Sequence, residues 1–165
     1  YQLQEDRRTW RKAQTPMHYL LLDGAFGSPE VGAIVGAGGT IMFTEDSGYT
    51  WERASIIGEP SIRFNAVFFA GNKGAWAVGS KGGIFSSNGG GRLWRQQFSG
   101  VTANLTDVHF TSPTSGWAIG ENGVIVRTRD GGANKSSPSS GISPVDNCRR
   151  TSFVLPCERN TGKEP

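Results

Sequence analysis

Short apolar runs separated by glycine-rich polar turns follow one another along most of the chain. Residues 64–69 alternate in character, residues 75–79 form a compact apolar run, and residues 83–87 and 94–98 each follow a turn. Runs of about four to eight residues bounded by turn residues are typical of β-strands in hairpins. A helical alternative is disfavoured, because each of the turn glycines would cost about 1 kcal/mol inside a helix. The pattern predicts an all-β protein.

The same pattern occurs three times in one register, and nine positions of the first unit recur at offsets of 43 and then a further 41 residues. In the first unit these positions are Phe26, Ala33, Val35, Gly36, Gly39, Ile41, Asp46, Gly48 and Trp51. In the second they are Phe69, Trp76, Val78, Gly79, Gly82, Ile84, Gly89, Gly91 and Trp94. In the third they are Phe110, Trp117, Ile119, Gly120, Gly123, Ile125, Asp130, Gly132 and Lys135. A four-stranded antiparallel meander with this period is typical of a β-propeller blade, whose length is roughly 40–50 residues.

The register of the repeats also predicts how the chain is organised. Trp10 lies 41 residues before Trp51, which indicates that the first residues end a preceding, more degenerate blade. After Lys135 the pattern stops and gives way to a segment rich in Ser and Pro. The predicted parts are a partial propeller over residues 1–135, with a blade end at 1–18 and blades at about 19–57, 58–100 and 101–135, and an irregular tail over residues 136–165.

Residues 44–51, TEDSGYTW, resemble the Asp box, a hairpin of sialidase-type and related propellers. Asp46 is expected to accept hydrogen bonds from nearby backbone N–H groups, Gly48 to supply a positive φ, and Trp51 to pack under the next blade. We interpret the motif as structural and not catalytic, since the second copy, residues 87–94, keeps the turn and loses the acid. The structural set comprises Thr44, Asp46, Gly48, Trp51, Trp94, Asp130 and Gly132.

The charge balance and the length of the apolar runs bear on whether the chain binds nucleic acid or spans a membrane. The net charge of +3 and the pI near 9.1 are not accompanied by an aromatic and basic stacking motif, so nucleic acid binding is not predicted. The longest apolar run, residues 19–22, is far shorter than the ~20 residues of a membrane span, which indicates a protein peripheral to a membrane at most. Because the chain starts at Tyr1, we expect a processed form or a fragment.

No constellation of catalytic or metal-ligating residues can be assembled from the sequence. Asp23 and Asp107 are not paired by any spacing, and His18 and His109 are isolated. We expect no enzyme activity, no metal and no cofactor. Cys148 and Cys157 could form a disulfide in an oxidising compartment or remain two thiols, and the sequence leaves both open.

Beyond the Asp box, the repeats resemble those of the photosystem II stability and assembly factor family. The resemblance rests on residues 74–79 (GAWAVG), on residues 115–132, and on the blade openings at 63–69 (RFNAVFF) and 21–26 (LLDGAF), and it covers roughly residues 10–132. That family consists of seven-bladed propellers of the thylakoid lumen in chloroplasts and cyanobacteria. The three blades recognised here imply a fragment, or a chain whose exposed ends other subunits cover.

The resemblance implies a non-catalytic protein that binds a photosystem II reaction-centre subunit or an assembly intermediate at the lumenal side of the thylakoid. A basic propeller face is implicated in partner contact in that family. In this chain a set of cationic side chains could form such a face and bind an acidic or carboxylate-bearing partner. The candidates are Arg53, Arg63, Lys81, Arg92, Arg95, Arg127 and Arg129, with Arg63 the first choice. The alternatives are a fragment of a sialidase-like or other carbohydrate-active propeller enzyme and an extracellular adhesive repeat module.

Overall fold

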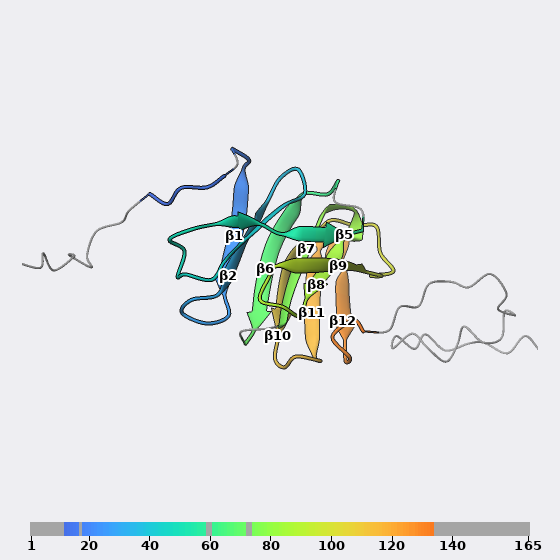
Figure 1. Ribbon diagram of the computed structural model, residues 1–165. Helices are drawn as coiled ribbons and strands as arrows, with labels where there is room; N and C mark the ends of the chain where they lie inside the picture. The colour runs from blue at the N-terminus through green and yellow to red at the C-terminus, as the bar shows by residue number, and fades with distance from the viewer. Residues whose placement is uncertain (1–11, 17, 59–60, 72–73, 134–165) are drawn as a thin grey trace, which may run out of the picture. The chain divides into compact units, whose positions relative to one another are not determined.

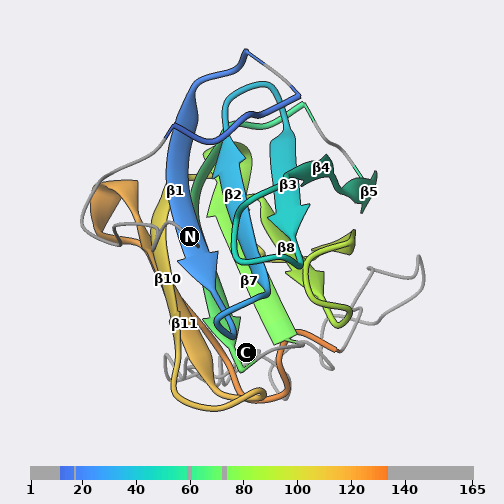
Figure 2. The same cartoon turned by 60° about the vertical axis from the view of Figure 1, so that its left-hand side comes forward.

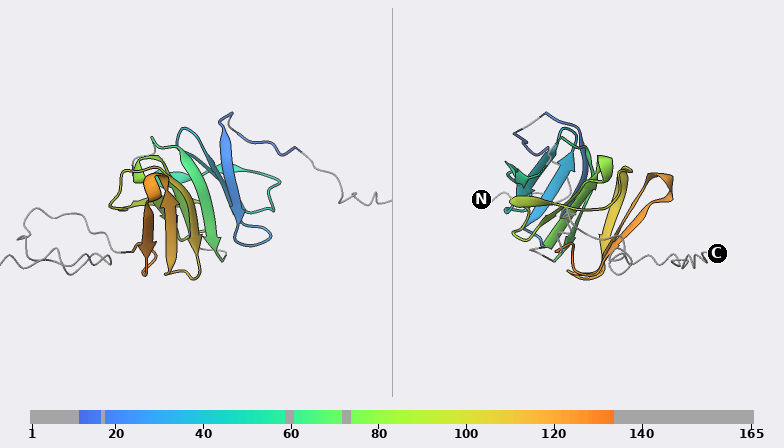
Figure 3. Two further views of the ribbon diagram at one scale, coloured as in Figure 1. Left: turned by 180° about the vertical axis from the view of Figure 1, so that it is seen from behind. Right: turned by 90° about the vertical axis from the view of Figure 1, so that its right-hand side faces the viewer.

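Three small β-sheets stand side by side, one for each repeat (Figure 1 and the right panel of Figure 3). The computed structural model describes residues 12–16, 18–58, 61–71 and 74–133. The sheets are built from short strands joined by tight turns, and the prediction of an all-β fold made of propeller-type blades is confirmed. No helix of the described residues is long and apolar enough to cross a membrane.

Each repeat forms one sheet, and we call the three sheets blades 1, 2 and 3. Blade 1 contains β1 (Leu21–Phe26), β2 (Gly32–Gly36), β3 (Thr40–Thr44) and β4 (Glu52–Arg53) in that order. Blade 2 contains β6 (Phe64–Ala70), β7 (Gly74–Gly79), β8 (Ile84–Ser87) and β9 (Leu93–Gln97), with β5 (Ser55–Ile57) added beside β9. Blade 3 contains β10 (Leu105–Phe110), β11 (Gly116–Gly120) and β12 (Ile125–Thr128). The residues after position 133, where an outer strand of blade 3 would follow, lie outside the described residues.

One strand pairs in a way that the sequence did not predict. Strand β5 follows the outer strand of blade 1 but pairs with β9 of blade 2, and this pairing is parallel, whereas the meander predicted antiparallel pairs throughout. The crossing begins at Ser55, whose N–H donates to the carbonyl of Arg92 at 2.9 Å. An outer strand leaves a row of unpaired N–H and C=O groups, and β5 satisfies part of this edge where it lies beside β9 (Figure 1). Figure 2 shows the chain passing from β4 into β5.

The glycine that ends the second strand of each blade is required by a close backbone approach. A Cβ atom at Gly79 would lie 2.1 Å from the carbonyl oxygen of Arg63. The corresponding distances are 2.0 Å from Gly36 to the Leu20 oxygen and 2.3 Å from Gly120 to the Asn104 oxygen. These contacts bring the start of each first strand against the turn after the second strand. The glycines that define the repeat therefore mark places where the backbone leaves no room for a side chain.

The hydrophobic core lies between the blades. One cluster joins blades 1 and 2 and contains Val35, Phe64 and Phe85, while the other joins blades 2 and 3 and contains Val78 and Leu105, and all five of these side chains are fully buried. Neighbouring sheets thus bury their faces against each other, as the layers of a propeller do.

Contrary to the prediction from the sequence, the tryptophans of the hairpins do not pack against the next blade. Trp94 of blade 2 belongs to the cluster shared with blade 1, the preceding blade, and not to the one shared with blade 3. Trp51 packs edge-on against Phe26 of its own blade, with ring centroids 6.1 Å apart. The expectation that Trp51 packs under the next blade is therefore wrong. The reason is local, because each indole N–H donates back to its own turn, to the carbonyl of Gly48 or Gly91, and this fixes the side of the sheet that the ring covers.

The chain separates into two units, residues 1–135 and residues 136–165. The second unit, which was predicted as the irregular tail, lies outside the described residues, and so do Cys148 and Cys157.

Candidate protein-binding site

The loops of the blades gather at two opposite ends of the sheets. At the hairpin end, the Asp-box turns lie against the loops between the first and second strands, since Ser47 N–H donates to the Glu30 carbonyl and Gly131 N–H to the Thr114 carbonyl. At the other end, the N–H of Ser80 donates to the carbonyl of Arg63 at 2.9 Å. We call this second end the Arg63 end. Each end is a surface that loops from successive blades build together.

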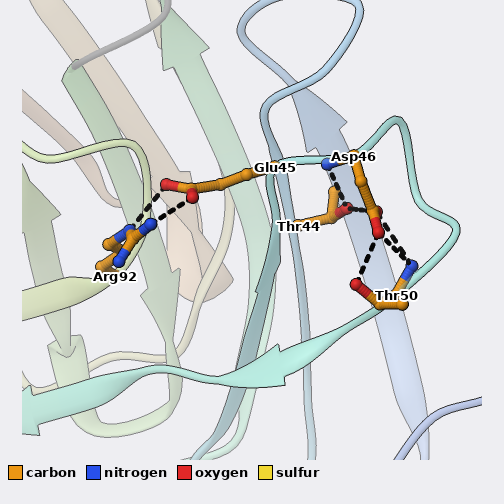
Figure 4. A network of polar contacts seen from close by, with 5 residues as sticks. All are labelled: Thr44, Glu45, Asp46, Thr50 and Arg92. Carbon is orange, nitrogen blue, oxygen red and sulfur yellow. Dashed lines mark hydrogen bonds and ion pairs between the residues drawn. The ribbon is translucent and has the colours of Figure 1, made fainter.

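The first Asp box is closed by a network around Asp46 (Figure 4). Its carboxylate accepts hydrogen bonds from the Thr50 hydroxyl at 2.6 Å, from the Thr50 N–H at 2.9 Å and from the Thr44 hydroxyl at 2.8 Å. These bonds, those from Thr50 first, lower the pKa of Asp46 from 3.8 to about 2. A carboxylate held this firmly in its ionised form is poorly suited to general acid catalysis near neutral pH.

The three hairpins share one side-chain hydrogen bond, which is made by the hydroxyl group at the first position of the motif. A hydroxyl at the first position accepts the N–H of the glycine four residues on in every blade: Thr44 from Gly48 at 3.0 Å, Ser87 from Gly91 at 3.2 Å and Thr128 from Gly132 at 3.0 Å. The acid occurs only at positions 46 and 130, and Asp130 accepts the N–H of Gly132 at 2.9 Å. Ser87 and Thr128 were not singled out from the sequence, although the S/T position of the motif marks both.

Arg92 and Glu45 form an ion pair between blades 1 and 2 (Figure 4). The guanidinium donates through Nε to Glu45 Oε1 at 2.6 Å and through a second nitrogen to Oε2, and it lies over the Phe43 ring, 5.5 Å from the centroid. The pairing lowers the pKa of Glu45 and raises the pKa of Arg92. Arg92 is therefore engaged within the protein.

A small open pocket of about 110 Å³ adjoins this pair at the hairpin end. It is lined by Phe43, Thr44, Glu45, Asp46, Thr50 and Glu52. Three carboxylates in one shallow pocket disfavour an anionic ligand there. The hairpin end of blade 1 is thus an unsuitable place for an acidic partner.

The Arg63 end brings two of the seven candidate cations close together in the structure. The N–H of Arg63 donates to the Ser80 hydroxyl at 3.0 Å, and Lys81 follows Ser80 in the same turn. Both cationic side chains are exposed. The turn is held on its other side by Asn104, whose side-chain oxygen accepts the N–H of Lys81 at 3.1 Å. Backbone hydrogen bonds on both sides therefore fix the place from which these two side chains project.

The other five candidates do not gather with Arg63 and Lys81. Arg92 and Arg129 lie in the hairpin turns at the opposite end, and Arg53, Arg95 and Arg127 lie on strands β4, β9 and β12. The guanidinium of Arg127 lies over the Trp117 ring, 5.4 Å from its centroid. The seven positions are exposed but do not form a single patch.

Lys81 adopts an uncommon backbone conformation. Its φ of 56° and ψ of 32° lie in the left-handed region, and the corresponding residue of blade 3, Asn122, has a φ of 57°. In blade 1 the same position is Gly38, with a φ of 65°. Glycine and asparagine suit this conformation and lysine does not, so the turn itself gives no reason for a lysine. Residues held in an unfavourable conformation are often retained for a function of their side chain.

The described residues contain no group of three His, Cys, Asp or Glu side chains that could hold a metal ion. The carboxylates of Asp23 and Asp107 each accept a hydrogen bond from a backbone N–H group. Asp23 Oδ2 accepts the N–H of Val67 in the next blade at 2.9 Å, and Asp107 Oδ1 accepts the N–H of Val108 at 2.8 Å.

Successive blades closed by Asp-box hairpins define a segment of a β-propeller of the Asp-box type. The chain belongs to the family described as photosynthesis system II assembly factor YCF48, whose family model matches residues 3–98 and 60–129. This assignment favours the assembly-factor interpretation over a carbohydrate-active enzyme or an adhesive module.

Similar proteins share both the sequence and the fold. The photosystem II assembly protein Ycf48 of Thermosynechococcus vestitus is 38% identical over 69 residues, which are 41% of this chain and 20% of that protein. A solved structure of YCF48 bound to D1 peptide is 31% identical, covers 73% of this chain and 41% of that chain, and superposes with a TM-score of 0.65. YCF48 from Cyanidioschyzon merolae is 27% identical, covers 76% of this chain and 41% of that chain, and gives a TM-score of 0.67. The chain thus spans less than half the length of these relatives.

Proposed function

We propose that this chain is a non-catalytic protein-binding propeller segment that contacts a photosystem II reaction-centre subunit during assembly. The observation that carries the proposal is the similarity, at 31% identity and a TM-score of 0.65, to YCF48 bound to D1 peptide. The subunit that we propose as the partner is D1. The site of action is the lumenal side of the thylakoid membrane, where the protein is peripheral.

We assign the partner contact to the Arg63 end of the propeller segment. The exposure of Arg63 and Lys81, and the unfavourable conformation in which Lys81 is held, support this assignment. Two neighbouring cations on rigid turns suit a peptide with acidic side chains or a free carboxylate. The hairpin end is less suitable, since Arg92 is paired with Glu45 and carboxylates line the pocket there.

The geometry of the Asp box supports the non-catalytic part of the proposal. Hydrogen bonds that close its own turn lower the pKa of Asp46 to about 2. The hydrogen bonds around this carboxylate are sufficient to explain its lowered pKa by a structural role in the turn.

A binding experiment with purified protein tests the proposal. Overlapping peptides that tile the D1 sequence are titrated against the full chain, and at least one is expected to bind. The variant Lys81→Gly removes the charge and relieves the left-handed conformation, so we expect the free energy of unfolding to stay equal or rise while peptide affinity falls. Arg63→Ala is expected to weaken the same peptide, and Arg53→Ala, an exposed arginine on β4, is the matched control.

Two outcomes would overturn the proposal, namely failure of every D1 peptide to bind, and recovery of no photosystem II subunit when the protein is isolated from thylakoid membranes. Binding that is unaffected by Lys81→Gly and Arg63→Ala, or that is weakened equally by the Arg53→Ala control, would reject the Arg63 end while leaving D1 as the partner.

A further inference from the structure

At the Arg63 end, the turn after the second strand of a blade meets the next blade through a repeated backbone contact. The N–H of Gly39 in blade 1 donates to the carbonyl of Ile62 at 2.8 Å, and the N–H of Gly82 in blade 2 donates to the carbonyl of Ala103 at 2.8 Å. The two donors are repeat counterparts with φ of 68° and 66°, and the two acceptors are counterparts as well. The junction of blades 1 and 2 and the junction of blades 2 and 3 therefore share one backbone arrangement.

The junction of blades 2 and 3 contains a side-chain oxygen that accepts one further backbone N–H. Lys81, the residue before Gly82, donates its N–H to the side-chain oxygen of Asn104 at 3.1 Å. The nitrogen of the same side-chain amide donates to Glu121 Oε2 at 2.9 Å, which holds the amide in its orientation. In this junction the chain itself supplies an acceptor for the N–H of the left-handed turn.

The junction of blades 1 and 2 offers the same N–H group without that oxygen. Gly38 is the counterpart of Lys81 and has a similar backbone, with φ of 65° against 56°. The counterpart of Asn104 is Arg63, whose guanidinium carries five donors and no acceptor. Gly38 and Arg63 are both exposed, and no acceptor of the Gly38 N–H is found among the described residues. Two donors therefore stand where the other junction has a donor and its acceptor.

We propose that this place binds a carboxylate group of the partner, a proposal that rests on the assignment of the partner contact to the Arg63 end. One carboxylate oxygen accepts the N–H of Gly38, in the position that the side-chain oxygen of Asn104 takes in the other junction. The guanidinium of Arg63 lies beside the same group, since its side chain starts from the backbone position equivalent to that of Asn104. Charged donors and backbone N–H groups together suit an anionic oxygen.

The shape of the occupied junction favours a carboxylate as the ligand. The side-chain amide of Asn104 is planar and has nearly the size of a carboxylate, and it fits against the left-handed turn. The ring of Tyr19 borders the equivalent place in the first junction, because a Cβ at Gly38 would lie 3.5 Å from it, and this side chain is 52% exposed. The place is therefore open to a peptide and is limited on one side by an aromatic ring.

Amide NMR of the full chain reports on the two junctions separately. The probes are an N-acetylated tetraalanine with a free C-terminal carboxylate, the same peptide amidated, and an amidated peptide with one aspartate. A bound carboxylate is expected to move the amide proton of Gly38 downfield, because its N–H gains an acceptor. The Lys81 amide, which is already bonded to Asn104, is the internal reference and is expected to stay in place, as is every amide with the uncharged peptide. The two charged probes distinguish a terminal from a side-chain carboxylate.

The variant Arg63→Asn reproduces the other junction. Its side-chain oxygen can accept the N–H of Gly38, so the Gly38 amide proton is expected to move downfield without any probe. The affinity for the carboxylate probes is expected to fall at least about tenfold, as for the loss of a charged hydrogen bond. Arg53→Asn, the same change at an exposed arginine on β4, is the matched control and is expected to alter neither quantity.

Three results would overturn this carboxylate site. They are a Gly38 amide that no carboxylate probe moves, an equal shift of the Lys81 amide, and an undiminished response of Gly38 in the Arg63→Asn variant. If D1 peptides bind the chain in any of these cases, the proposed function stands and only this site is rejected. Carboxylate probes that act at Gly38 while every D1 peptide fails to bind would support the site and reject D1 as the partner.

Discussion

The indole N–H of Trp76 in blade 2 donates to the carbonyl of Gly131 in blade 3 at 3.1 Å, across 55 positions of sequence. The ring of the same residue stacks on Phe110. One side chain therefore links the first strand and the hairpin turn of the neighbouring blade.

Substitution of Trp76 separates these two contributions. Trp76→Ala is expected to lower the free energy of unfolding by about 3–5 kcal/mol, because it leaves a cavity between the blades. Trp76→Phe keeps an aromatic ring and loses the donor, so its cost is expected to be about 1–2 kcal/mol. Urea denaturation measures both. Phe98→Ala, at an exposed position, is the control with an expected effect within about 0.5 kcal/mol. A cost of Trp76→Ala as small as that of the control would contradict this account.

The close backbone approach at Gly79 predicts a strong dependence on residue size. Gly79→Ala would place a methyl group 2.1 Å from the Arg63 oxygen. We expect a loss of about 1–3 kcal/mol, since the strands must move apart. Gly89→Ala is the matched control, because a methyl group there would meet no neighbouring group within 4 Å and the φ of Gly89 is not in the left-handed region. Denaturation midpoints of the two variants compare them directly, and equal values would refute the steric explanation.

Asp23 tests the polar link between blades 1 and 2. Asp23→Ala removes the acceptor of the Val67 N–H and leaves that donor between the blades, at an expected cost of about 1–3 kcal/mol. Asp23→Asn keeps an acceptor oxygen and is expected to cost less. Amide hydrogen exchange at Val67 reports the bond itself, with faster exchange expected in Asp23→Ala. Unchanged protection at Val67 would show that another group supports it.

The Asp46 network predicts a pH dependence of stability with a defined sign. Its pKa is lowered to about 2 in the folded protein, so the carboxylate contributes stability above its ordinary pKa of 3.8, and this contribution is lost as the pH falls toward 2. Asp46→Asn is expected to be less stable than the wild type at pH 7, with the difference shrinking between about pH 4 and pH 2.

The role of Thr50 in that network can be measured separately. Thr50→Ala removes the hydroxyl bond that lowers the pKa of Asp46 the most, so the pKa is expected to rise toward 3.8. Carboxyl carbon NMR titration of both proteins gives the two values. An identical pKa in wild type and Thr50→Ala would argue against the hydroxyl as the main cause.

The sequence alone determined the strand content, the repeat and its register. In blade 2 the predicted runs 64–69, 75–79 and 83–87 lie within a residue of strands β6, β7 and β8, and the fourth lies within one residue of β9. Local patterns were sufficient here, because alternation and turn glycines are properties of neighbouring residues.

The tertiary structure decided which blade each side chain faces. It turned Trp94 toward the preceding blade, paired β5 in parallel with β9, and engaged Arg92 with Glu45 while it left Arg63 and Lys81 exposed on adjoining turns. These outcomes depend on how sheets stack and where loops of different blades meet. A repeat determines what each blade contains, but contacts between residues more than 40 positions apart arise only when the blades are packed together.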